Sequence, residues 1–304
     1  MSMKQAISGT TQLAGVIGWP IDHSLSPAMH NAAYEQLGLD WVYLPLPVND
    51  QMDLARVVAA IRALPFVGFN VTMPHKRMML ELCDEVAAQA RLAGAVNTVH
   101  VRDGHLMGYN TDGRGLLESL RDEARFTPEG KRIVIVGSGG AAAAVLAALV
   151  LERAAHVTVI SRDPAHAEDL VSRIEVHARD TELVAVAMGP ENASYIEAAD
   201  VVVNATPLGR NAGDELPVRA EWLRSGQIVS DMVYRPLTTP LLVAAAKVGA
   251  IPIAGIGMLV AQGAIGIEIW KSDSTISAPR DVMRAACEAA IKCQGPDPSS
   301  AGEF

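Results

Sequence analysis

The side chains that could carry out proton chemistry include a lysine and an aspartate, each beside a predicted helix start. The segment GFNVTMPHKR predicts a strand that ends at Asn70 and a helix that begins at Pro74, with Lys76 in the first helical turn. A cation there faces the positive end of the helix dipole, which disfavours it locally. We therefore expect a functional role for Lys76, whose ammonium could exchange a proton with a substrate. Asp112, directly before Gly113, carries a carboxylate, although by itself it fits a helix cap better.

Two serines stand beside another predicted helix start. In the segment GWPIDHSLSPAMHNAAY, Ser26 fits the N-cap position and Pro27 the first helical position, which is a common helix start. This assignment explains Ser26 but gives Ser24 no role.

A glycine-rich turn between an apolar strand and a helix predicts a dinucleotide-binding site. RIVIVGSGGAAAAVLAALV contains Gly137-x-Gly139-x-x-Ala142, and a second strand-like run, HVTVISRD, follows where such a site requires it. Gly137 allows the tight turn, Gly139 lets the backbone approach a pyrophosphate, and Ala142 permits close helix packing. The helix N-terminus offers amides and a positive dipole end to the phosphates. The predicted contacts in this turn are Gly137, Ser138, Gly139, Gly140 and Ala141.

The choice of nicotinamide cofactor depends on the end of the second strand, which reads Ser161-Arg162-Asp163. A carboxylate there would bind the ribose hydroxyls of NAD, whereas an arginine would bind the 2′-phosphate of NADP. Asp163 would repel a 2′-phosphate if it pointed inward, but it could instead cap the helix that starts at Pro164. The sequence favours NADP, with NAD as the alternative because of Asp163.

These side chains need a scaffold, and apolar β-branched runs that alternate with helical stretches predict one of the α/β class. Continuous apolar strands are typical of parallel sheets with helices on both faces. The predicted strands are Ala14–Gly18, Trp41–Pro45, Gly68–Val71, Val96–Val101, Arg132–Val136, Val157–Ile160, Val201–Asn204 and Ile228–Val233. We expect two α/β domains, one split between residues 1–111 and 255–304 with a mostly parallel sheet, and an inserted Rossmann dinucleotide-binding domain of residues 112–254.

The composition limits the classes of function. The chain has 304 residues, 50% of them hydrophobic, which is enough for two globular domains. A net charge of −9 argues against non-specific nucleic-acid binding, which needs a basic face. The uncharged run Ile133–Leu151 is long enough to span a bilayer, but its glycines mark a buried strand, turn and helix. Three cysteines without metal-ligand spacing, and no recognisable signal peptide, predict a cytoplasmic protein without a bound metal.

Eight short motifs, in order along the chain, resemble those of one enzyme family. The first four are Ser24-x-Ser26, Asn70-Val71-Thr72-x-Pro74-x-Lys76, Gly94-Ala95-Val96-Asn97-Thr98 and Asn110-Thr111-Asp112-Gly113. The others are Gly137-x-Gly139-Gly140-Ala141, Asn204-Ala205-Thr206-Pro207-Leu208-Gly209, Asp231-Met232-Val233-Tyr234-x-Pro236 and Gly257-Met258-Leu259-x-x-Gln262-Gly263. With these motifs the chain resembles the shikimate dehydrogenase family from Ala14 to Trp270.

The resemblance implies reversible, NAD(P)-dependent hydride transfer between shikimate and 3-dehydroshikimate, with a nucleotide domain inserted into a split substrate domain. It implies that Lys76 and Asp112 are the catalytic pair. The substrate-binding residues that it implies are Ser24, Ser26, Thr72, Asn97 and Gln262. Hydroxyls beside a helix N-terminus can bind a carboxylate, and amides and hydroxyls can hold ring hydroxyls. The further cofactor-binding residues are Ser161, Arg162, Asp163, Asn204, Thr206, Met232 and Gly255.

The chain departs from the family pattern at three places. Ser161-Arg162-Asp163 stands where Asn-Arg-Thr is usual, and His166 stands near the place of a further arginine, which weakens the case for NADP. Ile267 replaces an aromatic residue that is frequent after the Gln-Gly motif. Met73 and His75 are variants inside the lysine motif and point to a specialised paralogue.

Two other functions fit parts of the sequence. A quinate/shikimate dehydrogenase would use the same pair of residues, often with NAD, but Ser26 favours shikimate because relatives that act on quinate tend to have threonine there. A ligand-sensing paralogue without catalysis would have the same fold, since fold alone does not fix function. The presence of both Lys76 and Asp112 argues against it. A monomer and a homodimer are both compatible with the sequence.

Overall fold

The computed structural model describes residues 7–272 and 277–294, which form two compact units. The first unit holds the described residues up to Thr111 and those from Val260 onward. The second unit runs from Asp112 to Leu259, so helix α10 (Gly255–Lys271) begins in the second unit and ends in the first. Residues 1–6, 273–276 and 295–304, which the sequence assigns to the split domain, lie outside the described residues.

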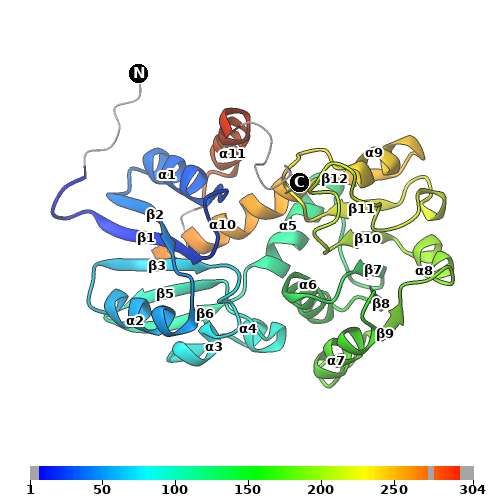
Figure 1. Cartoon of the computed structure of the whole chain (residues 1–304), viewed down its shortest axis with the longest axis horizontal. Coiled ribbons are helices and arrows are strands. Elements are labelled where there is room, and N and C mark those ends of the chain that lie inside the picture. Colours follow the sequence, from blue (N-terminus) through cyan, green and yellow to red (C-terminus); the bar gives the residue numbers. More distant parts are fainter. Residues whose placement is uncertain (1–6, 273–276, 295–304) are drawn as a thin grey trace, which may run out of the picture. The chain divides into compact units, whose positions relative to one another are not determined.

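The first unit is built on a six-stranded mixed sheet with the strand order β2-β1-β3-β5-β6-β4 (Figure 1). Its strands are β1 (Gln12–Gly18), β2 (Trp41–Pro47), β3 (Phe66–Val71), β4 (Glu85–Val86), β5 (Thr98–Arg102) and β6 (His105–Tyr109). β2, β1 and β3 run parallel, β5 is antiparallel to β3 and β6, and β4 is parallel to β6. The loops that follow β1, β2 and β3 therefore leave the sheet at the same end.

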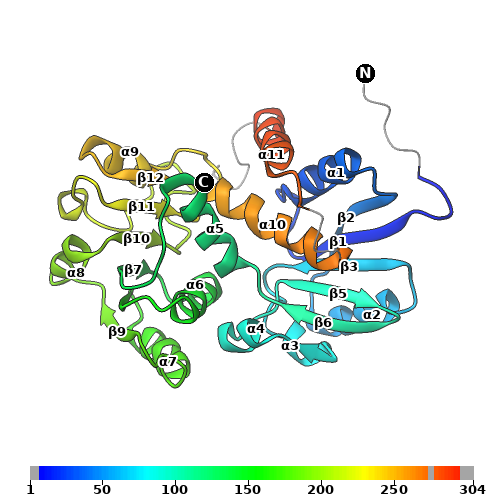
Figure 2. The same cartoon turned by 180° about the vertical axis from the view of Figure 1, so that it is seen from behind.

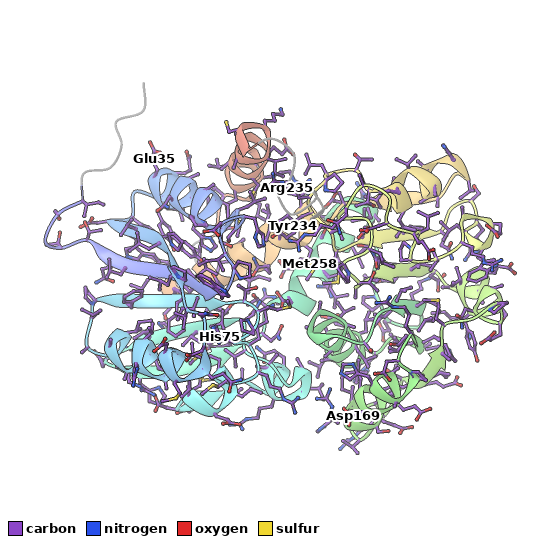
Figure 3. The ribbon with its side chains drawn as sticks, in the orientation of Figure 1. Glu35, His75, Asp169, Tyr234, Arg235 and Met258 are labelled. Atoms are coloured by element: carbon purple, nitrogen blue, oxygen red, sulfur yellow. The ribbon has the colours of Figure 1, made fainter. Side chains whose placement is uncertain are left out.

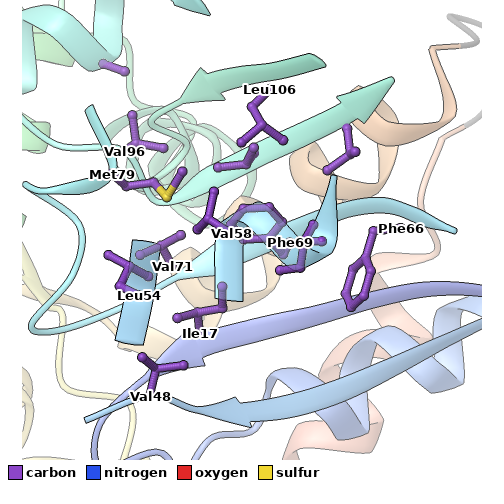
Figure 4. Close-up of a cluster of buried hydrophobic side chains, with 14 residues drawn as sticks. Ile17, Val48, Leu54, Val58, Phe66, Phe69, Val71, Met79, Val96 and Leu106 are labelled. Atoms are coloured by element: carbon purple, nitrogen blue, oxygen red, sulfur yellow. The ribbon is translucent and has the colours of Figure 1, made fainter. Parts of the chain in front are cut away.

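Helices cover both faces of this sheet (Figure 2). Besides α10 they are α1 (Ser26–Leu37), α2 (Gln51–Ile61), α3 (Met79–Leu82), α4 (Ala88–Ala93) and α11 (Arg280–Gln294). Helices α2 and α3 bury one face, and their Leu54, Val58 and Met79 form an apolar cluster with Ile17 and Phe69 of the strands (Figure 4). This cluster is the main core of the first unit and holds the ends of β1 and β3 in place.

The opposite face of the sheet packs on α1 and α10. Trp270 of α10 donates a hydrogen bond from Nε1 to the carbonyl oxygen of Val99 at 2.8 Å. A Cβ atom at Gly68 would collide with the indole of Trp270, so glycine is required at this point of β3. Successive side chains of a strand point to opposite faces, so Asn70 faces α10 while Phe69 enters the α2 core. The alternation in β3 thus places a polar side chain on the face that α10 covers.

The second unit contains a fully parallel six-stranded sheet with the order β12-β11-β10-β7-β8-β9. Its strands are β7 (Arg132–Val136), β8 (His156–Ser161), β9 (Glu182–Ala187), β10 (Val201–Asn204), β11 (Ile228–Asp231) and β12 (Ile251–Ile253). Its helices are α5 (Asp112–Ala124), α6 (Gly140–Leu151), α7 (Pro164–Glu175), α8 (Asn192–Ala198) and α9 (Pro240–Lys247), with a short 3₁₀ helix at Ala220–Trp222. α5, α6 and α7 lie on one face and α8 and α9 on the other (Figure 1).

This strand order is that of the Rossmann fold. From β7 the chain adds β8 and β9 on one side of the sheet and then β10, β11 and β12 on the other, so the order switches sides between β7 and β10. Ligands of such sheets bind at the carboxyl ends of the strands beside this switch. The predicted α/β class and the predicted Rossmann fold are confirmed. The uncharged run Ile133–Leu151 is β7 followed by the buried α6. Within the described ranges, no helix has the length and apolar character needed to cross a membrane.

The helix predicted to begin at Pro74 starts later than the sequence indicates. Residues 74–78 form turns, and α3 begins at Met79. His75 N donates to Thr72 O at 3.0 Å, which is a turn bond, and Met79 N donates to His75 O at 3.0 Å, which closes a single turn ahead of α3. The Thr72–His75 turn bond closes first, so a regular helix does not begin at Pro74. Lys76 therefore does not lie in the first turn of a helix, and the dipole argument for it was wrong.

Candidate active site

Ser24 and Ser26 lie where the loop after β1 enters α1. The helix begins at Ser26, and Leu25 occupies the N-cap position without a side-chain hydrogen bond, so the predicted N-cap role of Ser26 is wrong. Ser24 Oγ accepts a hydrogen bond from Ser26 N at 3.3 Å. The Ser24 hydroxyl thus lies beside the Ser26 backbone at the start of a helix of 12 residues, where amides and the helix dipole favour an anion.

A buried network of amides and hydroxyls joins β5, α10 and the end of β6 in the first unit. Asn97 Oδ1 accepts from Thr111 N at 2.8 Å, and Asn97 Nδ2 donates to Thr111 Oγ1 at 3.0 Å. Thr111 Oγ1 also donates to Gln262 Oε1 at 3.4 Å, and Thr98 Oγ1 donates to Asn97 Oδ1 at 2.9 Å. All four side chains are buried. The structure thus brings together Asn97 and Gln262, two predicted substrate residues that are far apart in the sequence.

The network extends from Thr98 toward β2. Asn70 Nδ2 donates to Thr98 Oγ1 at 3.0 Å, and Tyr43 OH donates to Asn70 Oδ1 at 2.7 Å. Burial raises the pKa of the Tyr43 hydroxyl well above its usual value, so this hydroxyl stays protonated and remains a donor. Each member therefore fixes the orientation of the next, and the amide of Asn97 is held from two sides.

An aromatic stack connects this network to the serines. The ring of His30 stacks on Tyr43 with 4.1 Å between centroids, and His30 Nδ1 lies 2.8 Å from the carbonyl oxygen of Ser26. Because that oxygen only accepts, Nδ1 carries the proton. Burial lowers the pKa of His30 to about 4, so the ring is neutral near pH 7. A neutral histidine thus holds the first turn of α1 against β2.

Thr72 and Lys76 lie on the loop that follows β3. Thr72 N donates to Ile17 O at 2.8 Å, and the carbonyl oxygen of Lys76 accepts from Val96 N at 2.9 Å. A Cβ atom at Gly18 would collide with the methyl group of Thr72, so only glycine lets the two loops approach this closely. The Lys76 backbone is therefore attached to the segment that leads into Asn97.

Asp112 opens α5, the first helix of the second unit, and is buried. It directly follows Thr111, whose backbone and side chain belong to the Asn97 network. A Cβ atom at Gly113 would collide with the carbonyl oxygen of Ala144 in α6, so α5 and α6 pack at backbone distance. The position of Asp112 is thus defined by a close helix contact in its own unit.

The glycine turn after β7 has the geometry that a pyrophosphate requires. Gly137 has φ +111°, and a Cβ atom there would lie 3.1 Å from the carbonyl oxygen of Ala205. Gly139 is the N-cap of α6 and makes no side-chain cap bond. A Cβ atom at Gly139 or Gly140 would meet nothing within 4 Å among the described residues. The N-terminus of α6 therefore carries no side chain at Gly139 and Gly140 and has room beside these two residues, which fits a phosphate group.

The end of β8 approaches this turn through serine hydroxyls. Ser138 Oγ lies 2.9 Å from Ser161 Oγ, which accepts from Asp163 N at 3.1 Å. Asp163 is the N-cap of α7, and its Oδ1 accepts from His166 N at 3.2 Å. Arg162 is exposed. The structure thus brings Ser138 and Ser161 together and uses the Asp163 carboxylate as a helix cap.

Asn204 and Thr206 stand at the end of β10 and are fixed by a buried carboxyl group. Asn204 Nδ2 donates to Asp231 Oδ1 at 2.9 Å, and Asn204 Oδ1 accepts from Thr206 Oγ1 at 2.6 Å. Thr239 Oγ1 donates to Asp231 Oδ2 at 2.6 Å. Burial raises the pKa of the Asp231 carboxyl, and the hydrogen bonds that it accepts oppose this rise. Asp231 therefore orders the loop after β10.

Met232 and Gly255 meet through their backbones in the second unit. Met232 N donates to Asn204 O at 3.0 Å. A Cβ atom at Gly255 would lie 2.7 Å from the carbonyl carbon and oxygen of Met232, so glycine lets the start of α10 approach the loop after β11. Asn204, Met232 and Gly255 thus lie close together, as their shared prediction as cofactor residues requires.

Several members of these networks were not predicted as site residues from the sequence: Tyr43, Asn70, Thr98, Asp231 and Thr239. Asn70 and Thr98 could have been found, because they stand inside motifs beside Thr72 and Asn97. Tyr43 gives no such signal, since it reads as one more apolar residue of a strand.

A Rossmann sheet with a glycine turn, together with a second α/β unit that has a buried polar network, is typical of dinucleotide-binding enzymes. Residues 16–99 match the family described as shikimate dehydrogenase substrate binding domain, and residues 122–212 match shikimate / quinate 5-dehydrogenase. The chain is 43% identical to shikimate dehydrogenase (NADP(+)) of Methanopyrus kandleri, with 94% of this chain and 98% of that protein covered. The chain belongs to the shikimate dehydrogenase family, as its motifs predict.

Solved structures of other members have the same fold. Shikimate 5-dehydrogenase of Listeria monocytogenes, in complex with shikimate and NAD, is 36% identical with a TM-score of 0.86, covering 93% of this chain and 98% of that one. Quinate dehydrogenase of Corynebacterium glutamicum, in complex with NAD, is 32% identical with a TM-score of 0.84, covering 92% of this chain and 99% of that one. The fold therefore admits both substrates and does not choose between them.

Proposed function

We propose that this protein is a shikimate dehydrogenase that interconverts 3-dehydroshikimate and shikimate with NADP. The observation that carries the proposal is the buried network of Asn97, Thr111 and Gln262 next to the Lys76 loop. Such a site offers both hydrogen-bond donors and acceptors to the ring hydroxyls of a substrate. Analogues without these hydroxyls are disfavoured, because buried polar groups of the site would then be left unpaired. The identity to the Methanopyrus kandleri enzyme supports both substrate and cofactor.

The first unit supplies the groups that bind the substrate. Ser24 and Ser26, at the N-terminus of α1, bind its carboxylate. The hydroxyl of Thr72 and the amides of Asn97 and Gln262 bind the ring hydroxyls. Because Asn97 and Gln262 are already oriented by neighbouring side chains, binding orders few additional rotamers and loses little entropy.

Lys76 and Asp112 act on the reacting C–O group. In reduction, the Lys76 ammonium stabilises the developing alkoxide and donates a proton to its oxygen, and in oxidation the lysine accepts the hydroxyl proton. The Asp112 carboxylate is the second member of the proposed catalytic pair and acts on the reacting hydroxyl. The nicotinamide cofactor, when bound, donates or accepts the hydride.

The second unit holds the cofactor. The backbone from Gly137 to Ala141 binds the pyrophosphate, for which the open space at Gly139 and Gly140 leaves room. Arg162 binds the 2′-phosphate of NADP, while Asp163 serves α7 as its cap and so does not repel that phosphate. The residues that line the nicotinamide side are Asn204, Thr206, Met232 and Gly255.

We assign residues 1–111 and 255–304 to the substrate domain and residues 112–254 to the nucleotide domain, although the first residues of α10, up to Leu259, pack in the second unit. The described cysteines Cys83, Cys287 and Cys293 are all unpaired, which fits a reducing compartment, and we place the enzyme in the cytoplasm. Its partners are its small-molecule substrate and cofactor, and it works as a monomer or a homodimer.

Quinate oxidation with NAD is the second candidate. The Corynebacterium glutamicum quinate dehydrogenase with NAD has the same fold, and Asp163 could bind ribose hydroxyls if it left its capping position. Ser26 favours shikimate, because quinate-acting relatives tend to have threonine there. Direct comparison of the two substrates separates the candidates.

The proposed function is tested by the oxidation of shikimate with NADP, followed through the absorbance of the reduced nicotinamide. The wild-type protein is expected to turn over, and Lys76→Ala should lower kcat by about a thousandfold, since general acid–base catalysis contributes roughly 10²–10⁴. Calorimetry should show that this variant still binds NADP with unchanged Kd. Near wild-type turnover in Lys76→Ala would contradict the assigned role.

A further inference from the structure

The loops that follow β1, β2 and β3 are tied to one another at one end of the first unit's sheet. Val48 N, after β2, donates to Gly18 O at 3.1 Å, and Trp19 N donates to Met73 O at 3.0 Å. Backbone atoms alone therefore join the first loop to the second and to the third. The second and third loops are instead joined by a side chain, the imidazole of His75.

His75 is completely buried, and its Nε2 lies 2.6 Å from the carbonyl oxygen of Val48. Figure 3 labels it in this part of the first unit. Because a carbonyl oxygen only accepts, Nε2 carries the proton and donates it. The acceptor is firmly anchored, since the Val48 side chain belongs to the apolar cluster with Ile17, Leu54 and Met79 (Figure 4). His75 thus attaches its own loop to the core of the unit.

The other nitrogen of the ring indicates that packing alone does not explain the imidazole. Nδ1 of His75 is buried and has no hydrogen-bond partner among the described residues. An unpartnered buried polar atom costs free energy that an apolar side chain of similar size would avoid. The hydrogen bond from Nε2 to Val48, which an apolar residue at this position could not make, is therefore the feature that distinguishes the imidazole.

We propose that His75 is a positioning residue for Lys76, an inference that rests on the proposed catalytic role of that lysine. The bond from His75 to Val48 fixes the backbone immediately before Lys76, and the bond from Val96 N to Lys76 O, at 2.9 Å, fixes it on the other side. The ammonium ends a flexible four-carbon stem, so a fixed backbone narrows the region that it can reach. Small displacements of a reacting group lower the rate strongly.

Three substitutions separate the donor from the shape of the ring. His75→Gln keeps an N–H near the place of Nε2, His75→Asn moves it toward the place of Nδ1, and His75→Leu removes it. We expect kcat to fall about tenfold to hundredfold in His75→Asn and His75→Leu, but less than about threefold in His75→Gln. KM for shikimate and Kd for NADP should stay near wild type, because the loss arises only in the transition state. Equal losses in His75→Gln and His75→Leu would overturn the proposal.

A double-mutant cycle tests whether His75 acts through the lysine. In a Lys76→Ala background, measured in single turnovers at high enzyme concentration, His75→Leu should have no further effect on the rate. Losses that multiply in the double variant would mean that His75 supports the fold in general and would overturn the proposal. The matched control is His156→Leu, which removes a buried histidine of the second unit whose Nε2 lies 3.0 Å from Thr158 Oγ1. This control should leave kcat unchanged.

The two failures can be told apart. A wild-type protein that does not oxidise shikimate, although it is folded and binds NADP, would contradict the proposed function itself. An active wild type that loses activity in Lys76→Ala, but shows multiplying losses in the cycle, would contradict only the role of His75.

Discussion

The two units hold their predicted ligand-binding residues in different ways. In the first unit the proposed substrate residues Asn97 and Gln262 are buried side chains that both hydrogen-bond Thr111. In the second unit the glycine turn after β7 offers mainly backbone, and Arg162, which we propose reads the cofactor, is an exposed side chain. The proposed substrate site is therefore built into the interior of its unit, whereas the proposed basis of cofactor choice is a residue at the surface.

The physical consequence is a difference in how easily each specificity can change. Altering a buried amide leaves its partners unpaired at a cost of about 1–3 kcal/mol each. Altering an exposed arginine removes a ligand contact and disturbs little else. We therefore expect substrate preference to be linked to the stability of the first unit, and cofactor preference to vary independently of it.

The largest expected effect is that of Asn97→Leu, which breaks the centre of the first unit's network. Thr111 N would lose its acceptor, and the hydroxyls of Thr98 and Thr111 would each lose one of their partners. We expect kcat/KM for shikimate to fall by about a thousandfold, because a buried N–H of the site is left unpaired and the amide that binds the ring hydroxyls is gone. Kd for NADP should not change. Asn192→Leu is the matched control, since Asn192 is a buried amide of the second unit that makes two hydrogen bonds to backbone. A similar loss of shikimate turnover in this control would contradict the network's special role.

The second effect is on the pH dependence of stability and concerns His30, the buried histidine that bonds the carbonyl oxygen of Ser26. Its pKa in the folded state is about 4, below the value of 6.5 for an exposed histidine, so the unfolded chain binds the extra proton first. Its contribution to stability is complete above pH 6.5 and is lost as the pH falls toward 4, by up to about 3 kcal/mol. Urea unfolding of wild type and His30→Gln between pH 7.5 and about 4.5 measures this. Parallel stability curves for the two proteins would show that His30 does not titrate in this way.

A smaller effect, on the affinity for NADP, is expected from Arg162→Ala at the surface of the second unit. Loss of a charged hydrogen bond to the 2′-phosphate should raise Kd for NADP by about tenfold to hundredfold, or roughly 1.5–3 kcal/mol. Kd for NAD and KM for shikimate should stay unchanged. Arg173→Ala, which removes an exposed arginine of α7 paired with Asp169, is the control. An equal loss for NAD and NADP would place Arg162 elsewhere on the cofactor.

The smallest effect is that of Asp163→Ala. The variant loses the N-cap of α7, which should lower the free energy of unfolding by about 1 kcal/mol. The ratio of the Kd values for NADP and NAD should change by less than about twofold, because the carboxylate is occupied at the helix start. Asp163→Asn retains the cap and should match wild type in both measurements. A tenfold gain in NADP affinity in Asp163→Ala would mean that the carboxylate does face the phosphate.

The same contrast explains what could be predicted from the sequence. The glycine turn was predictable because Gly137 and Gly139 are required by the local backbone conformation, and such a requirement is visible in a short sequence motif. The two serines and Gln262 were predicted from family motifs. The link from Tyr43 through Asn70 to Thr98 was not, because it joins three strands whose side-chain partners depend on register.

Two local errors have clear physical reasons. Lys76 was placed in a helix because Pro74 is a common first helical residue, but the Thr72–His75 turn closes first and delays α3 to Met79. The strand β12 was not predicted, since it has only three residues, two of them exposed, and one is Pro252. The role of Asp163 was undecidable from the sequence, because capping and ribose binding both suit a carboxylate after a strand.

The most direct test of the account measures kcat/KM for shikimate and for quinate, each with NADP and with NAD, on one preparation of the wild-type protein. We predict the highest kcat/KM for shikimate with NADP, about tenfold or more above the value for shikimate or quinate with NAD. The reason is that a site that hydrogen-bonds the hydroxyls of one substrate and the 2′-phosphate of one cofactor loses those bonds when either molecule is replaced. A value for quinate with NAD that equals or exceeds the value for shikimate with NADP would contradict this prediction.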